Sequence, residues 1–526
     1  MINRNLLLLT LLTIYALVGS WLSINTGFSH DEYHEQLNWE INLKAIKNFL
    51  NTNEYEELIN YKDKYHGIAF HILSQPIQII LSDFVQKISG ATISGAYLLS
   101  KHVAIFLIFS ISSIFFYLIS FKISKNFYFS LLSTLIYLSY PYFFGHAQIN
   151  PKDIPFMSFW LINTYIFFKL LENLYTENKI KASDIILFSF FTAFLISIRI
   201  SGIIIFLQYL IGLVILFNYK KFNIKTIFKK YIIQFFYFLL LLLFFLFILN
   251  PILWHNPLEL FNSINWMGKY QQNLCTLTLG NCMKSLNLPS SYYFIWLFFK
   301  LPIIIIFGVI LFPLIEKKIF LLNSLKLIYY LTILITPILI ILIFIFKNVA
   351  LYDEIRHIMF ILPLIFLVSL LNIYEFNNRL FYILTISFIS FFIIENFSIK
   401  PYQYTWLNSF AKFNNIDKSF EVDYWGISNK NLQKEIINYT SQKSLDDKLC
   451  VYGDNYTKEF LTKHNFKCFK NYAELDAAKI KPFFVYQNVR NLKRSNPKDC
   501  KLIFEESYNY SFSKQKIKVG NLWYCN

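Results

Sequence analysis

The amino-acid sequence predicts a polytopic α-helical membrane protein with about eleven transmembrane helices and a small α/β domain at its C-terminal end. Three observations predict this class. Hydrophobic residues make up 56% of the 526 residues, and charged residues make up only 15%, against about 25% in an ordinary soluble domain. Apolar runs of about 20 residues, the length that crosses a bilayer, recur along most of the chain. The last stretch of about 130 residues is instead polar and lysine-rich, and it is long enough for a small domain.

The composition also excludes several classes of protein. A disordered chain or a collagen-like fibre would not contain so many large apolar residues, and the chain is far too long for a small disulfide scaffold. A soluble enzyme could not bury this much apolar surface. The net charge of +17 fits lysines that anchor membrane helices and cover a polar domain. No basic face with interleaved aromatic residues forms a nucleic-acid-binding module.

The first apolar run, from about Asn5 to Ser23, has two interpretations. It could be a signal peptide, but no small-x-small cleavage site follows Val18-Gly19-Ser20, so we favour an uncleaved first helix. Ten further apolar runs predict spans, and they lie near residues 100–120, 127–144, 154–171, 184–198, 200–218, 231–250, 291–314, 325–346, 357–374 and 380–396.

Lysines in the short connections predict how these helices are oriented. Three lysine clusters fall on one side of the membrane if the N-terminus is cytoplasmic, namely Lys122 and Lys125; Lys220, Lys221, Lys225, Lys229 and Lys230; and Lys317 and Lys318. The outer side then carries the segments 27–90, 145–153, 251–290, 347–357 and everything after about 397. We therefore expect a transmembrane module over residues 1–396 and an outer α/β domain over residues 397–526.

The predicted outer domain contains recognisable strand and helix patterns. Lys448–Gly453 and Pro482–Gln487 are typical of strands, and Lys458–His464 is typical of a short helix. Cys500–Phe512 and Lys514–Cys525 predict a hairpin.

The six cysteines all fall in segments assigned to the outer side, where disulfides persist. They are Cys275, Cys282, Cys450, Cys468, Cys500 and Cys525. The sequence suggests that Cys275 pairs with Cys282, Cys500 with Cys525, and Cys450 with Cys468; free buried thiols are the alternative. No C-x-x-C pair indicates zinc binding or redox exchange.

The densest ionisable cluster follows the first span directly, as Ser29-His30-Asp31-Glu32-Tyr33-His34-Glu35. Adjacent carboxylates repel, so the pKa of one should be raised, which suits a general base or a pair of ligands for a divalent metal. The alternative is a solvated loop with a helix start, where acidic residues favour the first turn. His30 and His34 have the spacing of a zinc helix, but the glutamate is misplaced for the HExxH motif.

A second polar cluster runs from Gly145 to Pro155, between two spans. Asn150-Pro151 and Pro155 indicate a turn followed by a helix start. Lys152 beside Asp153 is either an interface anchor or part of a binding site, with Lys152 for a phosphate and Asp153 for a metal or a sugar hydroxyl.

Other segments place cations at the membrane boundary. Arg199, between two apolar runs, is costly unless it snorkels or has an anionic partner such as a lipid-linked phosphate. In Tyr352–His357, Asp353 and Arg356 form either an ordinary ion pair or, with His357, part of an anion site.

Three more segments have weaker signals. Asn250–Pro257, which includes His255, begins an outer loop and otherwise resembles a proline-stopped helix end. Lys400–Tyr404 and Glu421–Gly426 combine aromatic rings with carboxylates, an arrangement that grips sugars but also occurs as plain interface packing.

These outer segments together offer acids, bases and cations beside a bilayer, whereas the inner connections do not. A transporter would instead place ionisable groups at the membrane midplane, often on broken helices of repeated halves. The sequence contains no G-x-G-x-x-G motif and no P-loop for a nucleotide. An energy-rich substrate would therefore arrive within the membrane, as polyprenyl-phosphate sugars do.

These residues resemble those of a known family. Asp31-Glu32 after the first helix resembles the first-loop acidic motif of membrane glycosyltransferases with a GT-C fold, in the family 39 group of protein O-mannosyltransferases and aminoarabinose transferases. Further segments resemble a bacterial branch of that group, namely Gly145–Pro155, Ile198-Arg199, Tyr352–His357, and Pro401–Tyr404 with Glu421–Gly426. The resemblance covers about residues 1–430, and the tail after about 430 resembles no family that we can name.

The resemblance implies a sugar transfer, with inversion, from a polyprenyl-phosphate donor to an acceptor hydroxyl on the outer face. By analogy Asp31 is the general base, Glu32 orients the acceptor or a metal, and Asp153 is a second-loop acid. The implied ligands of the leaving phosphate are Lys152, Arg199, Arg356 and His357. The residues expected near the acceptor or the sugar are His34, His146, Asn150, His255, Asp353, Tyr402, Tyr404, Asp423 and Trp425.

Partners and location follow from the same resemblance. We expect a polyprenyl-phosphate-linked sugar, membrane lipids, and a glycan, lipid or protein acceptor, in a bacterial inner membrane with a cytoplasmic N-terminus and a periplasmic C-terminal domain. No cofactor is certain, and a divalent metal at Asp31 and Glu32 is left open. The alternatives are a lipid-linked glycan transporter or flippase and a non-catalytic envelope assembly protein. The chain lacks a multi-repeat sugar-binding domain, which argues against a protein acceptor.

Overall fold

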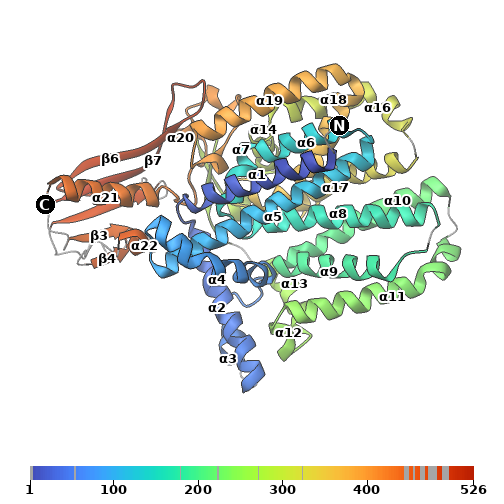
Figure 1. Ribbon diagram of the computed structural model, residues 1–526, viewed down its shortest axis with the longest axis horizontal. Coiled ribbons are helices and arrows are strands. Elements are labelled where there is room, and N and C mark those ends of the chain that lie inside the picture. The colour runs from blue at the N-terminus through green and yellow to red at the C-terminus, as the bar shows by residue number, and fades with distance from the viewer. Residues whose placement is uncertain are drawn as a thin grey trace.

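The structure, a computed structural model, consists of an elongated helical body with a β-sheet domain at one end (Figure 1). It describes residues 4–52, 55–177, 179–221, 224–269, 272–322, 324–443, 449–453, 457–461, 468–471, 482–488 and 497–526.

Helices account for nearly all of the first 400 residues, and the η elements are 3-10 helices. The first part of the chain forms α1 (Arg4–Ile24), α2 (His30–Asn51), α3 (Glu56–Asn60), α4 (Ala69–Ser89), α5 (Ile93–Ser124), α6 (Phe127–Ser139), α7 (Pro141–Ile149) and α8 (Asp153–Tyr175). The next part forms α9 (Ala182–Ile198), η1 (Ile200–Ile204), α10 (Ile205–Lys220), α11 (Ile224–Leu249), α12 (Ile252–His255), α13 (Glu259–Lys269), β1 (Cys275–Thr278), β2 (Asn281–Lys284) and η2 (Ser285–Asn287).

The remaining elements complete the body and form the C-terminal domain. The body ends with α14 (Ser291–Lys300), α15 (Ile303–Ile310), α16 (Phe312–Phe320), α17 (Ser324–Phe346), η3 (Arg356–Ile361), α18 (Leu362–Phe376) and α19 (Asn378–Ser398). The C-terminal part forms η4 (Gln403–Thr405), η5 (Ala411–Phe413), α20 (Ile416–Ser419), α21 (Asn429–Lys443), β3 (Cys450–Gly453), α22 (Thr457–Leu461), β4 (Cys468–Asn471), β5 (Phe483–Asn488), β6 (Cys500–Asn509) and β7 (Lys516–Cys525).

The predicted class, a polytopic helical membrane protein with a small α/β domain at its C-terminal end, is confirmed. Seven of the described helices are long and apolar enough to cross a membrane, and α14 with α15 makes an eighth if that bent pair is one span. Three shorter apolar helices lie at Leu8–Ile24, Phe127–Ser139 and Ala182–Ile198. Together these account for the eleven predicted apolar runs.

Two of the predicted spans are broken at a proline, so each consists of two helices. The run 127–144 divides into α6 and α7 at Tyr140-Pro141, and the run 291–314 divides into α14 and α15 at Leu301-Pro302. The latter pair is bent by 117°. In both cases the residue before proline has an extended ψ, of 117° at Tyr140 and 134° at Leu301, because the proline ring disfavours a helical conformation there.

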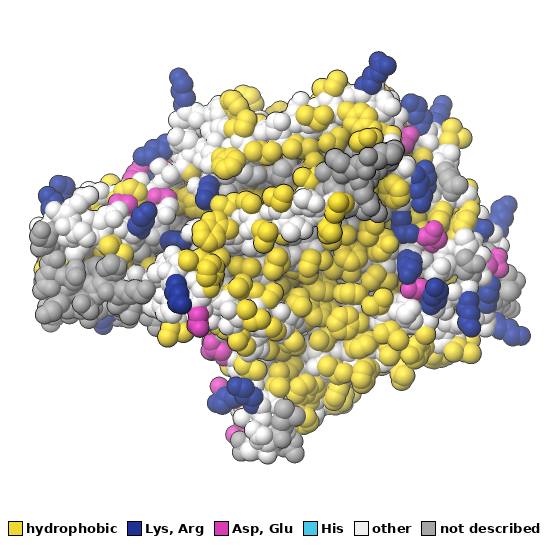
Figure 2. Space-filling model, in the orientation of Figure 1, with side chains coloured by type: hydrophobic (Ala, Val, Ile, Leu, Met, Phe, Trp, Pro, Cys, Tyr) yellow, Lys and Arg dark blue, Asp and Glu magenta, His cyan; other side chains and the backbone are white. Residues whose placement is uncertain are grey.

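The polar and apolar surfaces are separated along the body. Figure 2 shows apolar side chains over its middle and lysines and arginines gathered at the end away from the sheet. The sheet domain and the C-terminus lie at the opposite end (Figure 1). Which of the two ends faces the cytoplasm stays a prediction.

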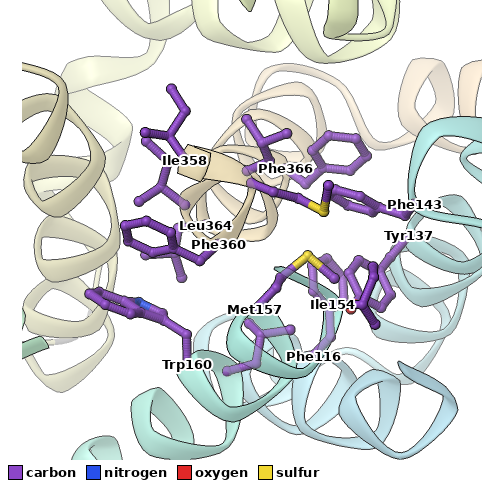
Figure 3. Close-up of a cluster of buried hydrophobic side chains, with 14 of the residues drawn as sticks. Phe116, Tyr137, Phe143, Ile154, Met157, Trp160, Ile358, Phe360, Leu364 and Phe366 are labelled. Carbon is purple, nitrogen blue, oxygen red and sulfur yellow. The ribbon is translucent and has the colours of Figure 1, made fainter. Parts of the chain in front are cut away.

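A tightly packed aromatic core fixes the helices that carry the polar residues of interest. Phe116 of α5 stacks on Tyr137 of α6 with ring centroids 4.7 Å apart, and Trp160 of α8 packs on Phe360 of η3 at 4.4 Å. Figure 3 shows these rings around Met157 at the centre of the bundle. Because α8 and η3 begin at Asp153 and Arg356, this packing also positions their first residues.

The C-terminal domain is a five-stranded sheet in the order β4-β3-β5-β7-β6. β3 pairs in parallel with β4 and β5, whereas β7 is antiparallel to β5 and β6. The predicted strands at Lys448–Gly453 and Pro482–Gln487 and the predicted hairpin are confirmed as β3, β5 and β6–β7, and residues 444–448 lie outside the described part. The short helix predicted at Lys458–His464 is observed over Thr457–Leu461, and residues 462–464 are also outside that part. The sequence did not predict β4 or α21.

Two of the three expected disulfides are confirmed. Cys275 is bonded to Cys282 and Cys500 to Cys525. Cys450 is also disulfide-bonded, and strand pairing places it opposite Cys468, whose side chain lies outside the described part of the chain.

Gly145 allows α7 to lie directly on the backbone of η4. A Cβ at this position would lie 2.1 Å from the backbone nitrogen of Tyr404 and 2.6 Å from the carbonyl carbon of Gln403. Both obstacles are backbone atoms, so a side chain at position 145 requires η4 to move.

We expect Gly145→Ala to destabilise the protein by about 1–3 kcal/mol, the usual effect of overpacking a well-packed site. Thermal unfolding of the purified protein in detergent should show the lower midpoint. An unchanged midpoint would mean that η4 can withdraw from α7 at no measurable cost.

Candidate active site

Five separate parts of the chain meet at the end of the helical body that carries the sheet domain. They are the start of α2, the start of α8, the residue that follows α9, the start of η3, and the segment between α20 and α21. Each contributes a polar side chain that the sequence analysis had selected, in order Asp31, Asp153, Arg199, Arg356 and Trp425.

Arg356 is the centre of this cluster and is almost completely buried. Its Nη1 lies 3.0 Å from Oδ2 of Asp31 and 3.4 Å from Oδ2 of Asp153, and its Nη2 lies 3.4 Å from Oδ2 of Asp353. The guanidinium carbon also lies 5.5 Å from the centre of the Trp425 ring. One cation therefore bridges three carboxylates from different parts of the chain.

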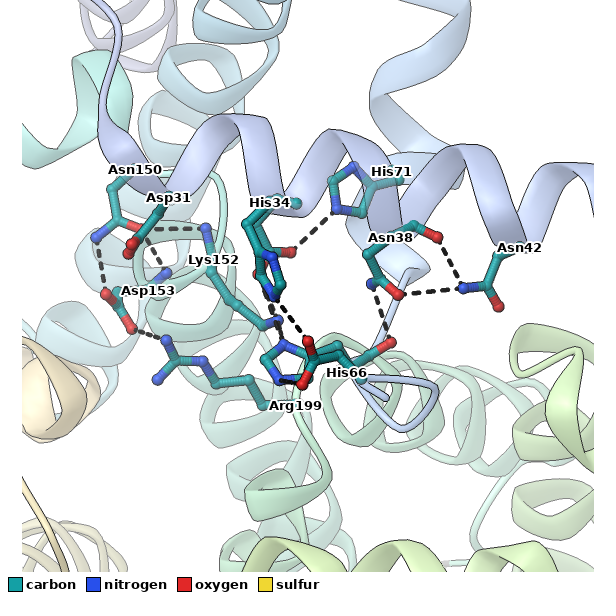
Figure 4. A network of polar contacts seen from close by, with 12 residues as sticks. Asp31, His34, Asn38, Asn42, His66, His71, Asn150, Lys152, Asp153 and Arg199 are labelled. Carbon is teal, nitrogen blue, oxygen red and sulfur yellow. Dashed lines mark hydrogen bonds and ion pairs between the residues drawn. The ribbon is translucent and has the colours of Figure 1, made fainter. Parts of the chain in front are cut away.

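Asp153 joins the second arginine to the cluster. Its Oδ1 lies 2.6 Å from Nη2 of Arg199, and its Oδ2 accepts a hydrogen bond from the Asn150 amide at 2.9 Å. The side-chain oxygen Oδ1 of Asn150 accepts from the backbone N–H groups of Lys152 and Asp153, so Asn150 also stabilises the first turn of α8. Figure 4 shows Asp31, Asn150, Asp153 and Arg199 converging on one region.

Asp31 is the accessible carboxylate of the cluster, since 41% of its side chain is exposed while Asp153 and Asp353 are buried. The Trp425 indole N–H donates to Oδ2 of Asp31 at 3.2 Å. The backbone N–H of His30 donates to the carbonyl oxygen of Trp425 at 3.1 Å, and the Asn429 amide donates to the carbonyl of Phe28 at 2.9 Å. The C-terminal segment thus holds the first turn of α2 from both sides.

Glu32 does not belong to this cluster, although it follows Asp31 directly. Its carboxylate is completely buried, with Oε1 2.5 Å from Nε2 of His102 on α5. Its other oxygen accepts from the backbone N–H of Ser29, which makes Glu32 part of a capping box at the start of α2. The two adjacent acids therefore point to different partners, and they do not form the pair of ligands that a metal at Asp31 and Glu32 would require.

Lys152, expected to bind a phosphate, is engaged instead in a neighbouring polar network. Its ammonium lies 2.7 Å from Oε1 of Glu35 and 2.9 Å from Nδ1 of His66. His71 lies 3.3 Å from the other Glu35 oxygen. This second network, with His34, Asn38 and Asn42, runs along α2 beside the arginine cluster (Figure 4).

Burial and charge set the protonation of this second network. Burial alone would raise the pKa of Glu35, but the Lys152 ammonium and hydrogen bonds with His66 and His71 hold it well below its usual range. Burial, and next the Lys101 ammonium, lower the pKa of His71 to about 4. His71 is therefore neutral and Glu35 ionised at neutral pH.

Several residues that were expected to contact the sugar are instead buried and pack around Trp425. The His146 ring lies against Trp425 with centroids 4.9 Å apart, and the Tyr424 hydroxyl lies 3.3 Å from Nε2 of His146. The Tyr404 hydroxyl donates to Oδ1 of Asp423. Burial raises the pKa of Asp423 to about 7 although hydrogen bonds oppose the shift. These buried residues form the packing that holds the Trp425 ring in place.

The remaining predicted residues lie outside the cluster or at its edge. His34 pairs with Asp63 at 3.2 Å, and the Tyr402 hydroxyl donates to Glu506 of β6 at 2.8 Å. His255 is exposed and packs against Tyr55, with ring centroids 5.8 Å apart. His357 packs on Tyr352 with ring centroids 4.6 Å apart, and its buried Nδ1 has no hydrogen-bond partner among the described residues.

Sequence reasoning missed a buried contact between a lysine and a glutamate that positions the backbone just before Arg356. Lys300 lies 2.6 Å from Glu354, and both side chains are fully buried. Asp353 and Glu354 have positive φ angles of 53° and 69°, which side chains other than glycine rarely adopt. Burial raises the pKa of Glu354 to about 8, against the effect of Lys300. Backbone strain of this kind accumulates at functional sites.

Among the described residues, no group of three or more His, Cys, Asp or Glu side chains is arranged to hold a metal ion. The cluster is instead built from carboxylates and guanidinium groups that pair with one another.

We expect Glu32→Gln to destabilise the protein far more than Asp31→Asn. Glu32→Gln leaves His102 buried without its anionic partner, and losing one member of a buried pair costs about 3–5 kcal/mol. Asp31 is half-exposed, so its replacement should lower the unfolding midpoint little. Thermal unfolding of both variants tests this contrast, and equal midpoints would refute the separate placement of the two acids.

We also expect stability to fall as the pH is lowered from about 6.5 to 4. In this window an unfolded His71 gains a proton, whereas the buried one, with a pKa of about 4, does not, so protonation favours the unfolded state. Unfolding midpoints measured across this range should decrease toward acid. In His71→Gln the slope should be smaller; an unchanged slope would show that His71 is protonated in the folded protein.

No protein-family model matches the chain, and no curated protein matches it. Two solved structures of ArnT from Cupriavidus metallidurans are similar to it at low identity. The apo structure has a TM-score of 0.46 and 9% identity, over 99% of this chain and 98% of that chain. The structure bound to undecaprenyl phosphate has a TM-score of 0.44 and 10% identity, over 98% of this chain and 97% of that chain.

Proposed function

We propose that this protein is a GT-C-like glycosyltransferase that moves a sugar from a polyprenyl-phosphate donor to an acceptor hydroxyl, with inversion, at the end of the helical body that carries the C-terminal domain. The contact between Asp31 and Arg356, at 3.0 Å, is the observation on which this proposal rests. It joins a half-exposed carboxylate, suited to remove a proton, to a buried cation, suited to hold a leaving phosphate.

Asp31 is the general base in this proposal because it is the accessible acid of the cluster. Its Oδ2 is held by Arg356 and by the Trp425 indole, which orients the carboxylate toward the exposed side. Asp153 and Asp353 are buried and paired with arginines, so they hold the cations in place instead of receiving protons. Glu32, expected to orient the acceptor or a metal, acts as a support for the start of α2.

The charges of the cluster suggest how proton transfer and sugar transfer are coupled. Two arginines, Arg199 and Arg356, face three carboxylates, so a donor phosphate competes with Asp31 for Arg356. When Asp31 takes the hydroxyl proton it becomes neutral and releases the guanidinium group. The same positive charge is then free for the phosphate that departs.

The proposed step is a single displacement. The acceptor oxygen loses its proton to Asp31 and forms a bond to the anomeric carbon. The bond from that carbon to the phosphate oxygen breaks, and its electron pair leaves with the polyprenyl phosphate. Arg356 and Arg199 then stabilise the leaving group, an effect that is worth several kcal/mol in a water-excluded site.

The surroundings of the cluster suit a substrate that arrives in the membrane. Arg199 follows the last residue of α9, an apolar helix. The neighbouring α11 exposes a row of large apolar side chains, among them Phe236, Leu240 and Phe244, and α9 and α11 pack against each other. A polyprenyl chain lying along this apolar surface would bring its phosphate to Arg199.

We expect Asp31→Asn to lower kcat by about 10²–10⁴-fold, the usual contribution of a general base, with the donor KM little changed. Arg199→Lys should instead raise the donor KM, because a lysine cannot replace a planar guanidinium group at a bidentate site. The assay is release of polyprenyl phosphate from a panel of polyprenyl-phosphate hexoses and pentoses by the purified protein in nanodiscs.

A matched control for this assay is Asp83→Asn, which removes an exposed carboxylate of α4 away from the cluster and should leave kcat unchanged. Wild-type turnover by Asp31→Asn would exclude Asp31 as the base. A lipid-linked glycan transporter would tolerate Asp31→Asn and would release no polyprenyl phosphate from any donor of the panel.

A further inference from the structure

The β6–β7 hairpin reaches back from the C-terminal domain along the outermost turns of α19. The rings of Phe512, in the hairpin turn, and Phe391, in α19, have centroids 6.4 Å apart. Phe391 lies seven residues before Ser398, where α19 ends, which corresponds to about 10 Å at 1.5 Å per residue. Because α19 is long and apolar enough to span the membrane, the turn lies level with the interior of a span.

Exposed aromatic side chains surround this turn. Phe512 is 84% exposed and Phe413 is 87% exposed, and the adjacent segments meet where the side-chain amide of Gln515 lies 3.0 Å from that of Asn415. Phe397, near the end of α19, is also exposed. Phe410 stacks on Phe298 of α14 with centroids 5.2 Å apart. We call Phe397, Phe410, Phe413 and Phe512 the aromatic rim.

The backbone conformation at Phe512 indicates that its side chain contacts something other than this chain. Its φ angle is +61°, a conformation that glycine or asparagine adopts easily and a bulky residue adopts at a cost. A phenylalanine here is unfavourable for the turn, and because the ring is so exposed, packing within the chain recovers little of that cost.

A buried ion pair fixes the position of the β6–β7 turn along α19. Glu395 of α19 is fully buried and lies 2.7 Å from the Lys412 ammonium, and it also accepts from the Ser511 hydroxyl. The Lys412 ammonium lies 4.7 Å from the centre of the Tyr510 ring. A carboxylate within a span needs such partners, so the hairpin turn and Lys412 are held to α19 instead of moving freely above it.

Lysines complete the polar side of this region. Lys400, Lys418 and Lys514 are exposed and flank the aromatic rim along the chain. Aromatic rings with lysines beside them are typical of side chains at the level of lipid headgroups, where the rings meet acyl chains and the ammonium groups meet phosphates.

We propose that the aromatic rim is inserted into the boundary between headgroups and acyl chains of the bilayer that α19 crosses, so that lipid directly supports the C-terminal domain. The occupant of this surface is phospholipid. Three observations favour lipid over a protein partner. The aromatic rim is continuous with the lipid-facing sides of α14 and α19, Phe512 lies level with the interior of a span, and lysines flank the rim.

The test uses spin labels on single introduced cysteines, in nanodiscs of phosphatidylcholine and phosphatidylglycerol that each contain one chain. The cysteines of the described residues are disulfide-bonded, so labelling favours the new thiol. Phe512→Cys and Phe413→Cys probe the rim. Ile386→Cys, in the middle of α19, is the reference for lipid, and Asn438→Cys, at an exposed position of α21, is the reference for water.

We expect labels at 413 and 512 to be more accessible to oxygen than to a water-soluble nickel chelate, as at 386, and the label at 438 to show the reverse. Water-like accessibility at 512 would overturn the proposal. If the rim were instead covered by a second copy or by another protein, that partner would be absent from a nanodisc that holds one chain. The label at 512 would then show the same water-like accessibility.

Discussion

The site depends on one guanidinium group that is shared by three carboxylates. Without Arg356, the buried acids Asp153 and Asp353 would repel each other in a region of low dielectric constant, and Asp31 would lose the partner that orients it. The three acids come from α2, α8 and the strained turn before η3, so their meeting point also fixes the relative positions of these elements. The same group links these elements and, in the proposed reaction, would hold the leaving phosphate.

Around this cluster the chain arranges further charged groups in fixed pairs. Three such pairs are buried at separate places, namely Glu32 with His102, Glu35 with Lys152, and Glu354 with Lys300. Buried pairs of this kind contribute little net stability but are costly to disrupt. Each pair holds one backbone segment next to the cluster, which in the proposed reaction would limit the rearrangement needed when a substrate binds.

The sequence allowed the class of fold and much of the cluster to be predicted, because both depend on local signals. Apolar runs identify spans, and a carboxylate or an arginine at the end of a span, as with Asp31 and Arg199, is visible without a structure. Partners could not be predicted, because they depend on how helices pack. Asp31 and Glu32 are adjacent, but successive helical positions are rotated by about 100°, so only the structure shows that one meets Arg356 and the other His102. The same reason explains why Glu35 was not recognised as the partner of Lys152, and why the pair of Lys300 and Glu354 was missed. The parallel pairing of β3 with β4 could not be predicted for the same reason, because it depends on tertiary contacts.

The interlocking of the first turn of α2 with the segment at Trp425 has a consequence for biosynthesis. The hydrogen bond between Trp425 and Asp31 spans 394 positions, and that between Asn429 and Phe28 spans 401. At about 5–20 residues per second, a ribosome needs roughly 20–80 s to make the intervening chain. During that interval the nascent protein already has its first helices in the bilayer but lacks the tryptophan that orients the acid. The cluster around Arg356 is therefore completed only after almost all of the bundle has been inserted, so a polypeptide truncated after the last span would be a lipid-embedded body without the contact between Trp425 and Asp31.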